Sequence, residues 1–193
     1  MEFRQALCRT LTELMEKDPR ICVIDADLAK PNGTFPLYEK FPNRCYNAGI
    51  SEANMASIAA GLSAYGMIPF IVTFAPFASR RICDQIAVSI AYAKQKVIIV
   101  GTDPGITAEV NGGTHMSFED IAVVRSIPNM VIFDAADSKQ LGDAILLGET
   151  TEATFDLNSN EAVKQLMANA NILVKAIGNN VEAIDNWTSE LFF

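Results

Sequence analysis

Glu52 is the acidic residue with the most informative sequence setting. It follows the run Asn47-Ala-Gly-Ile-Ser51, in which Gly49 permits a close approach of backbone and Ser51 is a suitable N-cap for a helix that begins at Glu52. An acid in the first turn of a helix complements the helix dipole, which is worth about 0.3–1 kcal/mol. The same carboxyl group can also hold or transfer a proton in a reaction. The position of Glu52 is compatible with both roles.

Two phenylalanines, Phe74 and Phe77, lie three residues apart where an apolar run ends. Aromatic rings stack or meet edge to face at centroid separations of about 4.5–7 Å, so such a pair can form a wall for a flat ring. The two side chains can equally belong to an ordinary apolar core. Taken alone, the pair favours the core interpretation.

The polar, glycine-rich segment 102–115 is long for a connection inside a compact domain, and such loops are frequently functional. It ends in Asn111-Gly-Gly-Thr-His115, and His115 is the single histidine of the chain. A histidine can transfer protons near neutral pH, and one that follows two glycines is well placed to reach a substrate. As a single signal, this motif is weak.

Helix-like segments alternate with short β-branched runs along the chain, which is typical of an α/β fold. Apolar runs predict strands over residues 20–25, 44–47, 67–73, 97–101 and 130–133. Helical spacing predicts helices over residues 2–17, 52–64, 80–93, 118–125 and 138–147. We therefore expect a parallel sheet with helices on both faces. Asp25 and Asp27 would then lie at the mouth of the first strand, where buried parallel strands deliver side chains to a site.

The length of 193 residues suits one substantial core and is short for two ordinary domains. The character of the sequence changes near Gly148, after which a polar stretch leads into an Asn- and Ala-rich segment with helical spacing. We predict one main domain over residues 1–148 and a short, mostly helical tail of unknown role over residues 149–193.

Composition excludes several classes of partner. The net charge is −8 and no block of Lys or Arg is present, so a nucleic-acid partner is not expected. Residues 53–79 carry no charge, but polar residues and two prolines interrupt them too often for a membrane span. The sequence predicts a protein that binds neither nucleic acid nor membrane.

The four cysteines, Cys8, Cys22, Cys45 and Cys83, share no close spacing, and only one histidine is available to join them. Neither a zinc site nor a disulfide framework is indicated. Charges lie where the apolar core of an export signal would be. We expect free thiols and a cytoplasmic location.

Together these segments resemble the pyrimidine-binding domain of transketolase. The resemblance rests on Asn47-Ala-Gly-Ile-Ser-Glu-Ala-Asn-Met55, on Thr73-Phe74 with Phe77, and on Gly112-Gly-Thr-His115, in this order and spacing. Asp84-Gln-Ile86 and Arg125-Ser-Ile-Pro-Asn-Met130 extend it, and it covers about residues 1–147. The chain is most similar to the C-terminal chain of split, two-chain transketolases.

The resemblance implies a thiamine-diphosphate site. In that family, the glutamate that matches Glu52 hydrogen-bonds a ring nitrogen of the cofactor's aminopyrimidine and controls its tautomer. Phe74 and Phe77 match aromatic residues that pack against this ring. Arg80 replaces a third aromatic residue and offers its guanidinium plane as a stacking surface. Asp27 matches an acidic position near the cofactor and the subunit contact.

The resemblance also implies a substrate site and a partner. His115 matches a histidine that contacts the hydroxyl groups of the sugar substrate, and Asn111 stands where the family has an aspartate. The family's Gly-Asp-Gly motif, which holds Mg²⁺ and through it the diphosphate, is absent from the sequence. A diphosphate-binding partner chain is therefore implied, in a homodimer or an α2β2 assembly.

The implied reaction is the transfer of a two-carbon ketol unit between sugar phosphates in pentose phosphate metabolism. Two alternatives remain open at this point. The first is the related chemistry of 1-deoxyxylulose-phosphate synthase or of a 2-oxoacid dehydrogenase beta subunit. The second is a truncated remnant without catalytic activity, which the short tail and the changes at Arg80 and Asn111 suggest.

Overall fold

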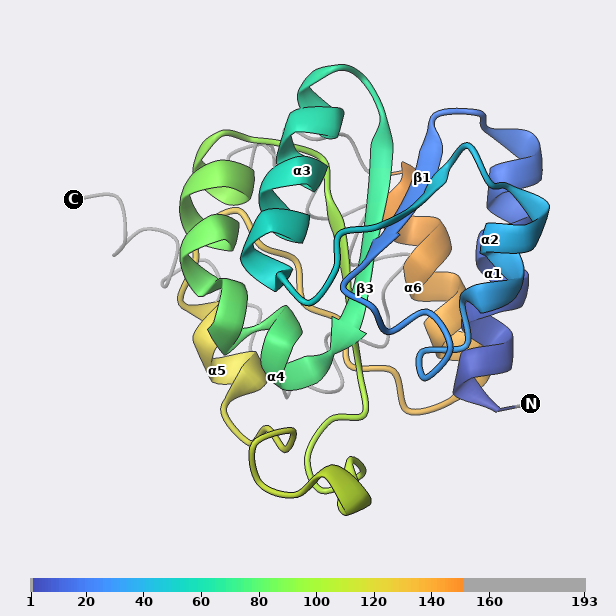
Figure 1. Cartoon of the computed structure of the whole chain (residues 1–193). Coiled ribbons are helices and arrows are strands. Elements are labelled where there is room, and N and C mark those ends of the chain that lie inside the picture. The colour runs from blue at the N-terminus through green and yellow to red at the C-terminus, as the bar shows by residue number, and fades with distance from the viewer. Residues whose placement is uncertain (1, 151–193) are drawn as a thin grey trace. The chain divides into compact units, whose positions relative to one another are not determined.

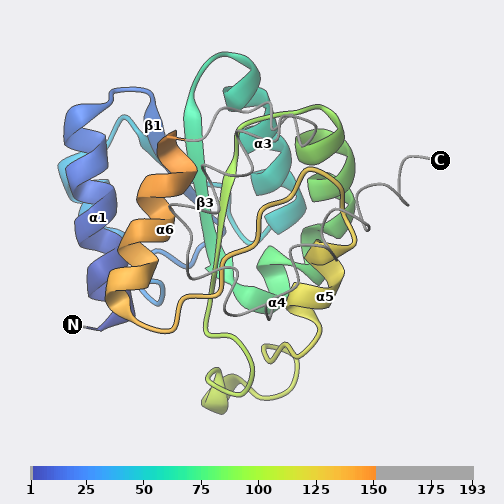
Figure 2. The same cartoon turned by 180° about the vertical axis from the view of Figure 1, so that it is seen from behind.

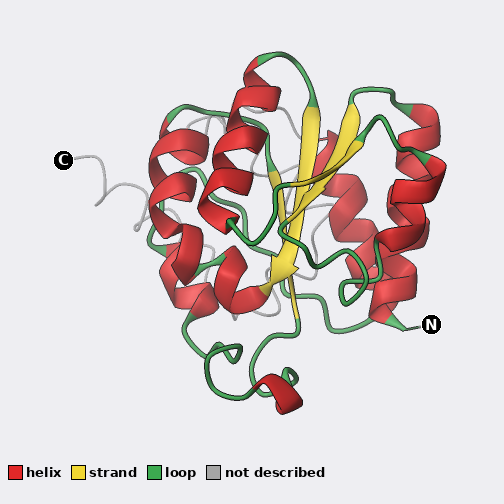
Figure 3. Cartoon of the chain, in the orientation of Figure 1, coloured by secondary structure: helices red, strands yellow, loops and turns green. Residues whose placement is uncertain are grey.

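A computed structural model describes residues 2–150 of the chain. Apart from its first two residues, the tail predicted over 149–193 lies outside the described residues. Within them, helices and strands alternate as the sequence predicts (Figure 3).

Four parallel strands form the central sheet in the order β2-β1-β3-β4. They are β1 (Ile21–Asp25), β2 (Cys45–Asn47), β3 (Ile68–Phe74) and β4 (Ile98–Thr102). Every residue of β1 and β3 is buried, which explains why these strands read as continuous apolar runs. The expected parallel sheet is confirmed.

Helices cover both faces of this sheet (Figures 1 and 2). On one face α1 (Phe3–Lys17) packs against α6 (Ser138–Thr150), with α2 (Phe35–Lys40) beside α1. On the other face α3 (Glu52–Ala64) packs against a π-helix, η2 (Gln85–Tyr92). The strands contribute alternate residues to two apolar clusters: Phe70 and Val72 face α1, whereas Ile71 faces α3.

The carboxyl ends of the strands lead into short, tight connections. β3 runs directly into α4 (Ala75–Ala78), which packs against β4. Gly101 makes this close packing possible, because a Cβ atom there would lie 3.1 Å from the Cα of Ala75. After β4 a long loop, with the 3-10 turn η3 (Glu109–Asn111), projects from the same end and leads to α5 (Asp120–Arg125) (Figure 1).

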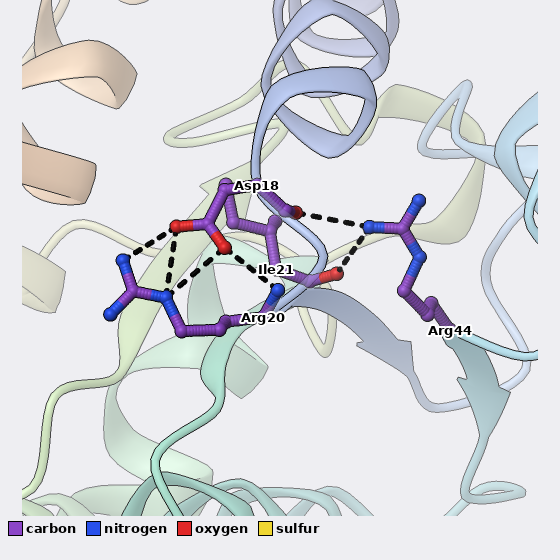
Figure 4. Close-up of polar contacts among 4 residues, drawn as sticks. All are labelled: Asp18, Arg20, Ile21 and Arg44. Carbon is purple, nitrogen blue, oxygen red and sulfur yellow. Dashed lines mark hydrogen bonds and ion pairs between the residues drawn. The ribbon is translucent and has the colours of Figure 1, made fainter.

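At the opposite end of the strands, two arginines hold the turn from α1 into β1 (Figure 4). The carboxylate of Asp18 accepts hydrogen bonds from the backbone N–H and the guanidinium of Arg20. Arg44, just before β2, donates to the carbonyls of Asp18 and Ile21 at 3.1 and 3.4 Å. The start of β1 is thereby tied to its neighbour β2.

The structure differs from the sequence expectation in three places. The helix α2 was not predicted. The helix expected over 80–93 is not a regular α-helix: it begins with the 3-10 turn η1 (Arg80–Ile82) and continues as the π-helix η2.

The third difference concerns residues 130–133, where the predicted strand is wrong. These residues form no regular element and pair with no strand of the described chain. The chain turns immediately before them at Asn129, whose φ is 64°, and the Asn129 amide is tied to the carbonyl of Ala91. Val131 is 46% exposed, so a strand here would not be buried on both faces.

Among the described residues, no helix combines the length and the apolar character needed to cross a bilayer.

Candidate functional site

Glu52 is a buried acid at the carboxyl edge of the sheet. It begins α3, and its side chain is only 4% exposed. Gly49 turns the chain before it with a φ of 71°, a conformation that favours glycine. Burying a carboxylate is costly unless it is paired, so the surroundings of Glu52 decide what it can do.

The two phenylalanines form a wall together with His115. Phe74 and Phe77 stack with ring centroids 6.2 Å apart and an interplanar angle of 28°. The imidazole of His115 meets both rings edge on, at 6.0 Å from Phe74 and 5.1 Å from Phe77. Phe74 is 6% exposed and Phe77 is half-buried, so the wall is anchored in the core and opens on one side. The sequence assigned His115 to the substrate, and its contact with these two rings is a finding of the structure.

Arg81 joins the acid to the wall. Its Nη1 atom lies 3.3 Å from Oε2 of Glu52, and its guanidinium carbon lies 5.0 Å from the centroid of the Phe77 ring. The cation therefore neutralises the buried carboxylate and packs on the aromatic face at once. Sequence reasoning missed Arg81 and assigned the stacking position to its neighbour Arg80.

Arg80 points to the long loop instead. Its guanidinium binds Glu119 at 2.5 Å and donates to the carbonyl of Thr114 at 3.2 Å. The other carboxylate oxygen of Glu119 accepts the backbone N–H of Phe118. This network ties the loop on both sides of His115 to the turn after β3. Hydrogen bonds from Phe118 and Arg80 hold the pKa of Glu119 below its usual value.

Asp27 contributes to the loops at the mouth of the site rather than to its wall. It has a φ of 64° and is exposed. Asp27 and Asn47 bond reciprocally, the backbone N–H of Asp27 donating to Asn47 Oδ1 at 3.0 Å and Asn47 Nδ2 donating to Asp27 at 3.1 Å. Asn47 Oδ1 also accepts the N–H of Gly49 at 2.8 Å. The pair fixes the backbone that leads to Glu52.

Asp25 is a second buried acid, at the end of β1, but its oxygens are used within the fold. One accepts the N–H of Leu28 at 2.9 Å, and the other accepts a hydrogen bond from the hydroxyl of Tyr38. Burial, reinforced by this carboxylate, raises the pKa of Tyr38. Asp25 therefore positions the loop after β1.

Asn111 lies in the projecting loop, in η3, and is exposed. Its backbone N–H donates to Ala108 at 2.8 Å. The structure thus brings together Glu52, Phe74, Phe77 and His115, places Asp27 and Arg80 in adjoining networks, and leaves Asn111 on the loop.

The site is suited to a flat ring that carries nitrogen atoms. An aromatic face lies on one side, a buried carboxyl group can exchange a hydrogen bond or proton with a ring nitrogen, and a planar nitrogen cation, Arg81, already satisfies both contacts. Among the described residues, no group of three or more His, Cys, Asp or Glu could hold a metal ion.

The chain is similar to known proteins along most of its length. A curated relative from Clostridium sp. (strain MSTE9), "6-deoxy-6-sulfo-D-fructose transketolase subunit SqwH", is 50% identical over 139 residues, which are 72% of this chain and 43% of the relative. A Methanocaldococcus jannaschii protein, "Putative transketolase C-terminal section", is 42% identical over 70% of this chain and 43% of its own length. The chain therefore spans less than half the length of these relatives.

Solved structures agree with the sequence relatives. A chain described as "Split gene transketolase, inactive beta4 tetramer" superposes with a TM-score of 0.69 at 40% identity, covering 78% of this chain and 48% of the other. Residues 1–148 match the family model "Transketolase, pyrimidine binding domain". The chain therefore belongs to the transketolase pyrimidine-binding-domain family.

Proposed function

We propose that this chain is the pyrimidine-binding subunit of a two-chain, thiamine-diphosphate-dependent transketolase. In this proposal it transfers a two-carbon ketol unit between sugar phosphates once a diphosphate-binding partner chain completes the site. The observation that carries the proposal is the buried carboxyl group of Glu52, which Arg81 joins to the Phe74–Phe77 wall. Two split-transketolase relatives, at 50% and 40% identity, support it.

The residues of the site fit the aminopyrimidine end of this cofactor. Phe77 would pack against the ring, and an oxygen of Glu52 would hold the proton shared with a ring nitrogen. Burial of Glu52 excludes water from that proton. When bound, the cofactor supplies the carbon–carbon chemistry, while the protein orients its ring.

The substrate would approach from the side of His115, whose imidazole borders the wall and whose loop is tied by Arg80. We assign to His115 the binding of a sugar hydroxyl group, with Asn111 farther out on the same loop. Asp27 would support the contact with the partner chain from the mouth of the site. Mg²⁺ and the diphosphate are assigned to that partner.

The test of the role of Glu52 is the variant Glu52→Gln, assayed for ketol transfer in a complex with the partner chain. The amide cannot share a proton, so we expect turnover to fall by orders of magnitude while cofactor binding stays detectable. Glu39→Gln, an exposed acid on α2, is the matched control and should keep wild-type turnover. Equal turnover in Glu52→Gln and wild type would refute the assigned role.

A second reaction class is favoured by one observation. A 1-deoxy-D-xylulose-5-phosphate synthase from Lawsonia intracellularis is 36% identical over 74% of this chain and 22% of its own length. The two reactions use different donors: transketolase uses a ketose phosphate, and 1-deoxy-D-xylulose-5-phosphate synthase uses a 2-oxoacid. Supplying each donor to the same complex separates them, and we expect product from the ketose phosphate.

A further inference from the structure

Arg81 makes two contacts at once in the site. Its guanidinium reaches Oε2 of Glu52 at 3.3 Å and lies 5.0 Å from the centre of the Phe77 ring. Among the described residues, it is the cation that is paired with this buried acid. The side chain of Arg81 is itself 54% exposed, whereas that of Glu52 is 4% exposed.

An aminopyrimidine ring needs the same two contacts. It must stack on an aromatic face at about 4.5–7 Å between centres, and one ring nitrogen must lie within hydrogen-bond distance of the carboxyl group. Like a guanidinium, it is flat and rich in nitrogen. A guanidinium and such a ring cannot both lie between Glu52 and Phe77.

We propose that Arg81 is a built-in occupant of the ring site, which must swing out before a cofactor ring can enter. The proposal rests on the proposed function, since it takes the incoming ring to be an aminopyrimidine. It adds a regulatory property to the site: the subunit on its own keeps the ring position closed, and ligand binding is coupled to a side-chain movement.

The surroundings of Arg81 permit this movement. More than half of the side chain already faces solvent, so leaving the site exposes a group that water solvates well. The neighbouring cation, Arg80, is bound to Glu119 and to the carbonyl of Thr114, so it does not replace Arg81 on Glu52. The incoming ring would instead supply the new partner of the buried acid.

Occupancy by Arg81 lowers the apparent affinity of the site for a ring. If only a fraction of molecules has Arg81 outside the site, the apparent affinity equals the intrinsic affinity multiplied by that fraction. Arg81 is the exposed partner of this ion pair, and a pair at the upper end of the range measured for exposed side chains changes the apparent affinity for the ring about fivefold. A variant without the guanidinium should therefore bind the ring more tightly by the same factor.

The test uses the full chain and, as its probe, the isolated aminopyrimidine half of thiamine, so that neither a partner chain nor turnover is needed. Calorimetric titration should show Arg81→Met binding the probe about fivefold more tightly than wild type. Arg81→Lys keeps a charge for Glu52 without a planar group over Phe77, and should bind with intermediate affinity. Arg9→Met, which removes an exposed arginine of α1, is the control and should match wild type.

A second measurement follows the guanidinium itself by nitrogen NMR. Saturation with the probe should move the Arg81 signal towards that of free arginine, while the signal of Arg44, which is anchored to two carbonyls, stays in place. Equal or weaker binding by Arg81→Met, or an unmoved Arg81 signal in the probe-bound chain, would overturn the proposal and leave the proposed function intact. Absence of binding in every folded variant would also overturn the proposal, whereas the proposed function is tested separately by ketol transfer in the two-chain complex.

Discussion

Two adjacent arginines at the site have different partners, and this difference separates their roles. Arg81 faces Glu52 and Phe77, whereas Arg80 faces Glu119 and the carbonyl of Thr114. The first pairing involves a buried acid, and the second joins two side chains that are each about 40% exposed. Exposed ion pairs contribute little to stability, so the main role of Arg80 is to fix the position of the loop around His115.

Replacing Arg80 should therefore loosen the loop without unfolding the domain. We expect Arg80→Ala to change the free energy of unfolding by less than about 1 kcal/mol, while backbone amides of residues 114–119 exchange hydrogen faster. Hydrogen exchange followed by mass spectrometry measures this. Glu119→Gln, which removes the other half of the pair, should give a similar pattern. Unchanged exchange in both variants would show that other contacts hold the loop.

Two buried thiols make stability sensitive to alkaline pH. Burial raises the pKa of Cys22 to about 11 and that of Cys45 to about 12, from an ordinary value of 9.0. As the pH rises above 9, the unfolded chain releases thiol protons that the folded chain still holds. The free energy of unfolding should therefore fall between about pH 9 and 12, and each unit of pKa difference corresponds to about 1.4 kcal/mol.

Denaturant unfolding at a series of pH values measures this dependence. Cys22→Ala removes one of the two thiols, so the decline of stability above pH 9 should become shallower in this variant. An identical decline in variant and wild type would mean that other groups cause the alkaline sensitivity, Tyr38 among them, since burial raises its pKa too.

At the scale of elements, the turn after β3 fixes the wall. The short helix α4 carries Phe77 and lies against β4 where Gly101 has no side chain. A Cβ atom at Gly101 would come within 3.1 Å of backbone, so α4 would have to shift by a few tenths of an ångström. The position of the wall thus depends on one small residue in the neighbouring strand.

A pair of Gly→Ala variants tests this dependence. Gly101→Ala should destabilise the domain by roughly 1–3 kcal/mol through overpacking, and weaken binding of a ring at Phe77. Gly61→Ala, in α3, meets no atom within 4 Å and should instead stabilise the domain by about 0.5–1 kcal/mol through its higher helix propensity. Thermal unfolding distinguishes the two, and equal shifts in the two variants would contradict this packing.

Elements with strong apolar patterns could be predicted from the sequence, and weakly patterned ones could not. The fully buried strands β1 and β3 read as continuous apolar runs. The six-residue helix α2, which begins Phe35-Pro36, is too short for a helical period to show. At residues 130–133 an apolar run does not form a strand, because Asn129 turns the chain and one side of the run stays exposed.

The candidate site could likewise be predicted only where its residues belong to clear sequence motifs. The motifs singled out in the sequence contain residues that lie close together in the structure, namely Glu52, Phe74, Phe77 and His115. The contacts of Arg81 with Glu52 and Phe77 could not be foreseen, because the resemblance gave a stacking role to Arg80 and no role to Arg81. Here the chain passes from a 3-10 turn into a π-helix, and the direction of successive side chains differs from the regular period.

At the scale of the whole molecule, the chain is less than half of the curated relatives that it matches at 50% and 42% identity. The described site has an acid, an aromatic wall and a histidine. Large apolar side chains also lie exposed on α3, directly after it and on η2, namely Ile58, Tyr65, Val88 and Tyr92. Exposed apolar side chains of this kind favour contact with another chain, and we propose that a diphosphate-binding chain completes the site.

The most direct test is ketol transfer measured with this chain alone, with a Gly-Asp-Gly-containing transketolase chain alone, and with the two mixed, each with Mg²⁺ and thiamine diphosphate. A shared site predicts turnover in the mixture and none in either chain by itself. Formation of the complex is verified by size-exclusion chromatography, so that a silent sample can be interpreted. A formed complex that transfers no ketol unit, or full activity in one chain alone, would contradict the proposal.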